Sequence, residues 1–172
     1  AFGTGDDPYE GGLDRFDRVQ DLLWRDYGAS ADAARIKHGY DRAGNRLWRE
    51  DPVAAANSKD FDALYAYDGL YRLSDFQRGN LNSTKDAIAS GTLNFAQDWG
   101  FDPLGNWLTF DEDSDGDGTD DLEQTREFNK ANEITDIDNG GWVVRAYDRN
   151  GNMTTLPQPA LCAPSAEPYQ TV

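Results

Sequence analysis

The chain has 172 residues, of which 38% are hydrophobic and 12% aromatic, and its formal net charge is −16. This surplus of carboxylates repels phosphate backbones and therefore disfavours nucleic-acid binding. One cysteine and one histidine allow no internal disulfide and leave a zinc site without its usual ligands.

The amino-terminal segment, residues 1–12, is rich in glycine and aspartate and predicts an extended arm or linker. A repeat domain is expected over residues 13–156. Six segments in it share one outline. An aromatic residue is followed by Asp or Asn, then by a short polar turn, and then by a residue that restarts the alternation of apolar and polar residues. Their aromatic residues lie 24, 27, 34, 27 and 19 residues apart, at Phe16, Tyr40, Tyr67, Phe101, Phe128 and Tyr147.

The chemistry of each segment favours a reversal of the chain. An Asp or Asn side chain accepts hydrogen bonds from backbone amides two residues on, which starts a turn. Gly44, Gly105 and Gly151 supply a positive φ where the chain turns back. The flanking residues 36–40, 46–49 and 142–147 alternate as in strands. His38 lies in the first of these flanks, and we interpret it as a strand residue. The sequence therefore predicts consecutive β-hairpins.

Two connections between hairpins have the character of short helices. Residues 51–56 have an Asp-Pro start followed by alanines, and residues 83–89 have a Ser-Thr start before Gly91. We therefore expect one or two helical turns in each.

The acidic insertion, residues 111–124, resembles a calcium loop. Aspartates alternate with small residues, and Gly118 permits a sharp bend. Calcium prefers six to eight hard oxygen ligands, which this segment offers densely. The spacing predicts a structural calcium site in which Thr119 offers its carbonyl oxygen and the other ligands are carboxylates: Asp113, Asp115, Asp117, Thr119, Asp121 and Glu123. A twelve-residue calcium loop that begins at Asp113 would end at residue 124 with a glutamate. The sequence departs from this pattern because residue 124 is Gln124 and the glutamate, Glu123, comes one residue earlier. The alternative is a solvated acidic hairpin tip that needs no metal.

The carboxyl-terminal tail, residues 157–172, contains prolines at 157, 159, 164 and 168. These predict an extended, polyproline-like segment that breaks the repeat. Cys162 lies in this tail, where it is available for an intermolecular disulfide.

The repeat resembles the tyrosine-aspartate (YD) signature of the rearrangement-hotspot (RHS) family. Residues 40–47 (YDRAGNRL) and 147–154 (YDRNGNMT) carry the resemblance, and residues 67–73 and 128–135 are similar to degenerate forms. The resemblance implies an all-β fold in which consecutive hairpins form a curved or spiral antiparallel sheet. Members of the family include bacterial polymorphic toxins, insecticidal toxin complexes and animal teneurins, in which the sheet often encloses a toxin. The resemblance implies a scaffold role. The sequence departs from the family in that nothing in it matches the self-cleaving core region.

An open sheet of this kind leaves unpaired backbone groups at both edges, which favour pairing with another chain. We therefore expect a non-enzymatic, secreted bacterial protein that associates with itself through edge strands and terminal arms into a fibre or shell. One alternative is a wall fragment of a toxin-encapsulating RHS shell.

A second alternative is a cell-surface adhesin or carbohydrate-binding module that uses exposed tryptophans, for which the candidates are Trp24, Trp48, Trp99, Trp107 and Trp142. An enzyme is not expected. Among 32 acidic residues, a pair of nearby carboxylates arises by chance and does not indicate a glycosidase.

Overall fold

The computed structural model describes residues 12–138 and 145–155. The expected arms at 1–12 and 157–172 therefore lie outside the described residues, apart from Gly12, as do Trp142 and Cys162. The described chain is all-β, as predicted, with a single short helix. The strands are β1 (Asp21–Asp26), β2 (Ala31–Tyr40), β3 (Arg46–Glu50), β4 (Asp62–Tyr67), β5 (Leu73–Gly79), β6 (Phe95–Phe101), β7 (Trp107–Asp113), β8 (Leu122–Phe128), β9 (Ile134–Ile137), β10 (Ala146–Tyr147) and β11 (Met153–Thr155).

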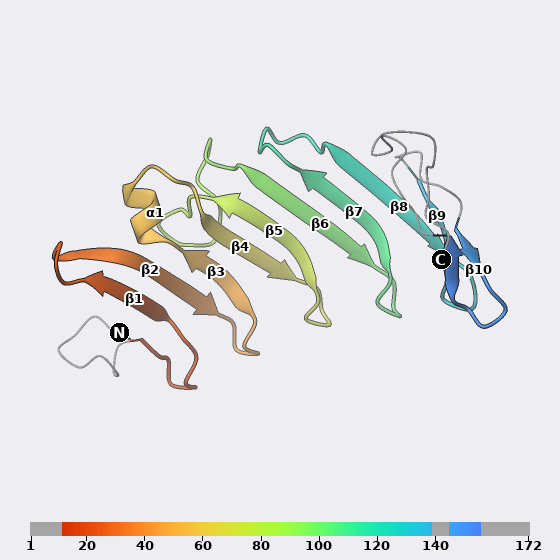
Figure 1. Ribbon diagram of the computed structural model, residues 1–172, viewed down its shortest axis with the longest axis horizontal. Coiled ribbons are helices and arrows are strands. Elements are labelled where there is room, and N and C mark those ends of the chain that lie inside the picture. Colours follow the sequence, from red (N-terminus) through yellow and green to blue (C-terminus); the bar gives the residue numbers. More distant parts are fainter. Residues whose placement is uncertain (1–11, 139–144, 156–172) are drawn as a thin grey trace. The chain divides into compact units, whose positions relative to one another are not determined.

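The strands follow one another in the order of the sequence. Strands β1 to β9 form one hydrogen-bonded sheet in chain order, and β10 pairs with β11 (Figure 1). The predicted succession of antiparallel hairpins is thus confirmed. The chain divides into two compact units, and we describe each by itself. Unit 1 comprises residues 1–97 and 113–119, and unit 2 comprises residues 98–112 and 120–172.

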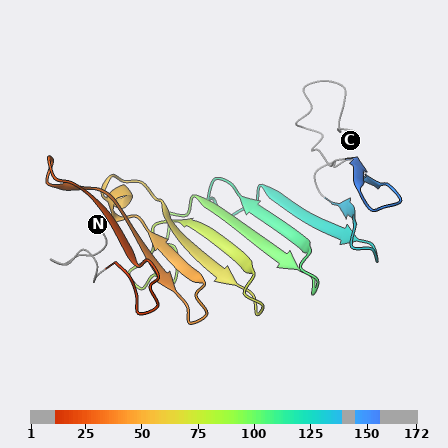
Figure 2. The same ribbon diagram turned by 60° about the horizontal axis from the view of Figure 1, so that its bottom comes forward.

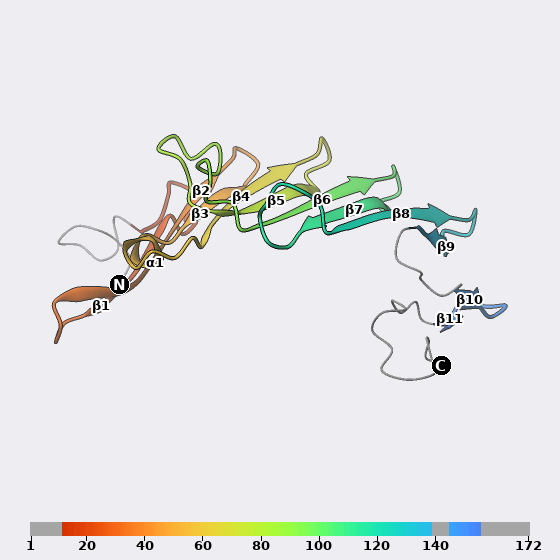
Figure 3. The same ribbon diagram turned by 90° about the horizontal axis from the view of Figure 1, so that it is seen from above.

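Unit 1 is built from a single layer of strands, which Figure 3 shows nearly edge-on. Strands β1 to β5 lie side by side, and the turns before β1, between β2 and β3, and between β4 and β5 lie at the same end (Figures 1 and 2). Because one layer cannot enclose a deep core, Ala63 in unit 1 and Ile137 in unit 2 are the only buried hydrophobic residues among those described.

Aromatic residues on neighbouring strands provide much of the packing instead. In unit 1, Tyr65 and Phe76 form a cross-strand pair with ring centroids 5.5 Å apart, and Phe95 continues the row at 6.0 Å from Phe76. In unit 2, the ring centroid of Trp99 on β6 lies 6.1 Å from that of Trp107 and 5.9 Å from that of Phe110, both on β7. Cross-strand aromatic pairs of this kind stabilise a sheet beyond the area they bury.

Helix α1 (Pro52–Ala56) confirms the helix expected at residues 51–56. Pro52 occupies the first turn, where its missing N–H costs nothing, and Asp51 caps the helix by accepting from the backbone N–H of Ala54 at 3.0 Å. The carboxylate of Asp62 accepts from the amides of Asp51 (2.7 Å) and Leu81 (3.0 Å). This buried side chain thereby joins the start of α1 and the start of the β5–β6 connection to β4.

The second expected helix, at residues 83–89, is wrong. These residues form turns and bends, and Leu81 pairs with Ile88 in an isolated antiparallel bridge. The side chain of Asn82 binds Asp86 at 2.7 Å, and Lys85 has a φ of 60°. An Asn side chain that bonds locally in this way stabilises a reversal at the expense of a helix.

Candidate functional site

Six five-residue turns in the described chain share one set of hydrogen bonds, and we call them the repeat turns, with positions 1 to 5. The N–H of position 1 donates to the carbonyl of position 5 at 2.9–3.0 Å, and the N–H of position 4 donates to the carbonyl of position 1 at 3.0–3.3 Å. Position 1 is occupied by Asp14, Asp41, Asp68, Asp102, Asn129 and Asp148.

The first repeat turn differs from the prediction. The sequence suggested Phe16-Asp17 as its aromatic and acidic pair, but the turn begins at Asp14, and Phe16 and Asp17 occupy positions 3 and 4. The side chain of Asp14 accepts from the amides of Phe16 (2.8 Å) and Arg18 (3.0 Å). With this correction, the first three turns are 27 residues apart, at 14, 41 and 68.

The side chains at positions 1 and 5 always join a carboxylate to a donor. An Asp at position 1 accepts a hydrogen bond from an Asn at position 5 in the pairs 41/45, 102/106 and 148/152, and from an Arg in the pairs 14/18 and 68/72. In the remaining turn, Asn129 donates to Glu133, and all six bonds measure 2.6–2.9 Å. In the turn that begins at Asn129, the donor is therefore at position 1 and the carboxylate at position 5, and the hydrogen bond between them is kept. The Asn82–Asp86 pair is a seventh, slightly longer variant with the same reversed polarity. This complementarity is the signal that would have revealed both Asp14 and Asn82 from the sequence.

These bonds favour the charged form of the turn aspartates. The residue at position 5 donates hydrogen bonds that hold the pKa of Asp68, Asp102 and Asp148 below its ordinary value. For Asp14 and Asp41, burial opposes the shift, but hydrogen bonds from the turn outweigh it and the pKa is again lowered. The turns are consequently stabilised by ionised carboxylates.

The tyrosine before a repeat turn ties that turn to the preceding one. The hydroxyl of Tyr40 donates to the carbonyl of Val19 at 2.9 Å, that of Tyr67 to Arg46 at 2.9 Å, and that of Tyr147 to Ile134 at 3.0 Å. Each acceptor is the residue directly after position 5 of the preceding turn. The repeated tyrosine and aspartate thus have separate structural roles: the aspartate closes its own turn, and the tyrosine fixes the next hairpin to it.

The contribution of the tyrosine hydrogen bond to stability can be measured by removing the hydroxyl before one repeat turn and by adding one before another. Tyr67→Phe should lower the free energy of unfolding by about 1 kcal/mol, because the Arg46 carbonyl loses its donor. Phe128 precedes a repeat turn without a hydroxyl, and the equivalent acceptor is the carbonyl of Trp107. Phe128→Tyr should therefore raise the free energy of unfolding by about 1 kcal/mol in denaturant titrations.

Tyr27 provides the matched control, because its side chain is 82% exposed. Tyr27→Phe should leave the free energy of unfolding within about 0.5 kcal/mol of the original protein. Equal losses for Tyr67→Phe and Tyr27→Phe would contradict the role given to the tyrosine before the turn.

The acidic insertion at residues 111–124, which we call the acidic loop, brings three of its predicted ligands together. Carboxylate oxygens of Asp113, Asp115 and Asp117 lie within 4.8 Å of one another. Asp113 is 3% exposed and accepts from the amides of Gly116 (2.6 Å) and Gly118 (2.9 Å). Burial alone would raise the pKa of Asp113, but these amides hold it below its ordinary value. The loop therefore folds around the Asp113 carboxylate.

The remaining predicted ligands are not part of this cluster. The N–H of Thr119 donates to Asp117 at 2.8 Å. In unit 2, the N–H of Asp121 donates to the carbonyl of Glu112 at 2.8 Å, and Glu123 lies in β8 opposite Asp111. With one oxygen from each of these three carboxylates, a bound calcium would need further oxygen ligands from carbonyls or water to reach the six to eight that it prefers.

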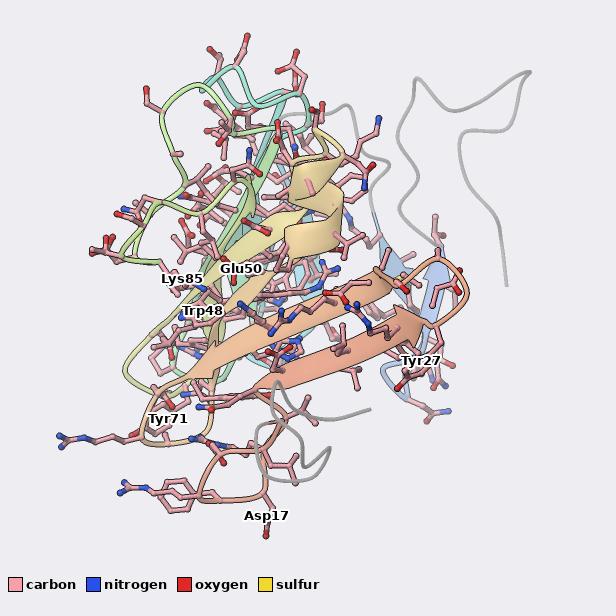
Figure 4. The ribbon with its side chains drawn as sticks, turned by 90° about the vertical axis from the view of Figure 1, so that its left-hand side faces the viewer. Asp17, Tyr27, Trp48, Glu50, Tyr71 and Lys85 are labelled. Carbon is pink, nitrogen blue, oxygen red and sulfur yellow. The ribbon has the colours of Figure 1, made fainter. Side chains whose placement is uncertain are left out.

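The tryptophans differ in how much of the ring they present. Trp48 packs on the backbone of Gly39 on one side and lies 4.2 Å from the ammonium group of Lys85, which binds Glu50 at 2.6 Å (Figure 4). Trp24 is 49% exposed and Trp107 is 40% exposed, the latter stacked on Phe110. The covered Trp48 does not fit the sugar-binding role considered for it.

The described residues define a class of protein: a repeat protein of antiparallel hairpins in which the same five-residue turn recurs six times. No helix in the described part of the chain is long and apolar enough to cross a membrane. No protein-family model and no curated protein matches the chain.

Solved structures of similar fold exist. The crystal structure of TcdB2-TccC3-TEV has a TM-score of 0.54 and 15% sequence identity over 91% of this chain. That of TcdB2-TccC3-Cdc42 gives 0.48 and 12% over 81%, and the Photorhabdus luminescens Tc holotoxin pore gives 0.46 and 11% over 81%. This chain spans 8–9% of the length of those chains. The first likeness supports an RHS-related fold.

Proposed function

We propose that this chain is a non-enzymatic, extracellular structural protein, a β-sheet building block that assembles with further copies of itself. The observation that carries the proposal is the succession of hairpins closed by the same turn and joined by tyrosine hydroxyls. Carboxylates of the repeat turns serve this scaffold: Asp14, Asp41 and Asp68 accept hydrogen bonds from backbone amides within their own turns. Among the residues that the structure describes, β1 pairs as a strand only with β2, and β9 only with β8. An open sheet edge favours strand pairing.

A wall segment of a larger RHS-type shell is the second candidate function. It is favoured by the likeness to a small part, 9%, of the long chain in TcdB2-TccC3-TEV. In such a wall, hairpins of the same polypeptide would cover the edges that a second copy covers in an assembly. Both candidates are scaffolds and differ in what pairs with β1.

Sedimentation velocity and electron microscopy of the purified chain test the leading proposal. We expect particles well above the 19.1 kDa monomer, increasing with protein concentration. A uniform 19.1 kDa species at all concentrations would contradict self-assembly and favour the shell wall.

We further propose that the acidic loop binds calcium and is stabilised by it. Supporting this are the three clustered carboxylates and the mutual repulsion that a cation would relieve. Calcium at about 100 times its dissociation constant should stabilise the folded protein by about 2.7 kcal/mol, which raises the midpoint of thermal unfolding.

The calcium experiment compares thermal unfolding with calcium, with magnesium and with a chelator. Asp115→Asn combined with Asp117→Asn should abolish the calcium effect while leaving the Asp113 carboxylate to hold the loop. An unchanged midpoint in the original protein would show that the acidic loop is a solvated hairpin tip.

A further inference from the structure

The two ends of the strands in unit 1 differ in charge. The end that holds the repeat turns, which we call the turn end, consists of residues 13–19, 40–46 and 67–73. It carries five arginines and four aspartates: Arg15, Arg18, Arg42, Arg46 and Arg72, with Asp14, Asp17, Asp41 and Asp68. The opposite end, which we call the acidic end, consists of residues 25–32, 49–62, 79–94 and 113–119, with ten acidic and four basic residues. Figure 4 shows Asp17 and Tyr71 at the turn end and Glu50 and Lys85 away from it.

The aspartates of the turn end are largely engaged, whereas several arginines are available. Asp14 pairs with Arg18 at 2.6 Å and Asp68 with Arg72 at 2.6 Å. The exposed residues Arg15, Arg42 and Arg46 form no ion pair with any residue that the structure describes. In a chain with a net charge of −16, this surface thus has a net charge of about +1 and three exposed arginines outside the ion pairs described.

The turn end also exposes large apolar side chains. Phe16, Leu70 and Tyr71 are 59%, 66% and 63% exposed. Phe16 and Leu70 both occupy position 3 of a repeat turn, so the 27-residue repeat places them at equivalent points. The guanidinium groups of Arg15 and Arg18 lie 4.7 Å and 5.2 Å from the Phe16 ring. A groove of about 500 Å³ beside them is lined by Phe16, Arg42 and Tyr40.

Position 4 has a positive φ in all six repeat turns that the structure describes, and Tyr71 is the one bulky residue that occupies it. It has a φ of 63° at position 4, where three other repeat turns have glycine and one has Asn132. A bulky residue in the left-handed region is rare, and such strain marks positions kept for another purpose. An exposed aromatic residue that is kept at a strained position favours a role for this end as a contact surface.

We propose that the turn end of unit 1 docks on the acidic end of unit 1 of a second copy. The chain carries both complementary surfaces, so each copy offers one end to its neighbour. Such a contact is heterologous and continues from copy to copy unless it closes into a ring. The inference rests on the proposed self-assembly and adds to edge pairing a second, end-to-end contact whose strength depends on salt.

Charge reversal at the turn end is the first test. Arg15→Glu combined with Arg42→Glu should weaken association about tenfold in sedimentation experiments, with a chelator present so that calcium at the acidic loop plays no part. Association of the original protein should also fall as salt rises. The matched control is Lys130→Glu with Arg149→Glu, which changes the same turn position, position 2, and the same net charge in unit 2.

Tyr71→Gly separates docking from folding. It should raise the midpoint of thermal unfolding by relieving the strain, yet weaken association by removing the aromatic contact. If assemblies form but neither the arginine variant nor Tyr71→Gly weakens them, the end-to-end contact is wrong while edge assembly stands. If the original protein is monomeric throughout, both proposals fail. Binding to anionic vesicles without self-association would instead identify the turn end as a membrane-contact surface and overturn the inference.

Discussion

Replacing Gly116 by alanine is expected to lower the free energy of unfolding by about 3 kcal/mol. Gly116 has a φ of 79°, a conformation that costs an L-residue about 1–2 kcal/mol. A Cβ at this position would also overlap the backbone of Leu93 and Asn94, which has no flexible end that can move aside. Overpacking of that kind adds about 1–3 kcal/mol. The acidic loop is thus held closely against residues 93–94 of unit 1.

Gly118 in the same loop is the control. Its φ is 86°, but a Cβ there would meet nothing within 4 Å. Gly118→Ala should cost only the backbone penalty of about 1 kcal/mol, so the difference between the two variants measures the close approach. Denaturant titration gives both values, and equal losses would show that the loop does not contact Leu93 and Asn94.

The sequence predicted the hairpins well because each turn is a local structure. At Asp41, Asp102 and Asp148, an acidic residue, a glycine three residues on and an amide at position 5 all favour the same reversal. The first turn was misplaced because Phe16-Asp17 imitates the pattern while Leu13-Asp14, without an aromatic residue, forms it. At residues 83–89 helix propensity was outweighed by the Asn82–Asp86 bond, which closes a hairpin.

Other features depend on register and long-range packing, which local patterns do not encode. The hydroxyl of Tyr40 reaches Val19 only because β2 lies beside the segment that leads into β1. Likewise, Gly116 was recognisable as a turn residue, but its approach to Leu93 follows from the fold. The calcium-loop spacing named Asp113, Asp115 and Asp117, whose carboxylate oxygens lie within 4.8 Å of one another, but the spacing alone could not reveal that Asp113 already binds two loop amides.

The second large effect is expected from acid, because ionised turn aspartates stabilise the fold. Hydrogen bonds within the turn lower the pKa of Asp41, Asp68 and Asp102 in the folded protein. A group whose folded pKa is lowered contributes stability above its unfolded pKa, about 3.9 for aspartate, and loses that contribution as pH falls through the folded pKa. The midpoint of thermal unfolding should therefore fall steeply as the pH is lowered below about 4.

Two other groups also respond to pH. Burial, together with Arg46 and Arg49, lowers the pKa of His38, so its protonation opposes folding below about pH 6.5. Burial and the neighbouring Asp120 raise the pKa of Asp111, so protonation of Asp111 favours folding in acid. Variants that keep both His38 and Asp111 share these contributions, which therefore cancel when their unfolding midpoints are compared at the same pH.

Asp41→Ala isolates one turn carboxylate. At pH 7 it should lower the unfolding midpoint clearly, since the amides of Gly44 and Asn45 and the side chain of Asn45 lose their shared acceptor. As the pH falls through the lowered pKa of Asp41, the original protein loses this charge as well, so the two midpoints should converge. Asp17→Asn is the control: it removes a carboxylate from the same end of unit 1, and asparagine tolerates the φ of 60° found there. Its effect should be small and nearly independent of pH. If the gap between Asp41→Ala and the original protein stays constant as the pH falls from 7 through the lowered pKa of Asp41, the ionised carboxylate does not stabilise the turn, and the aspartate acts there only through its shape.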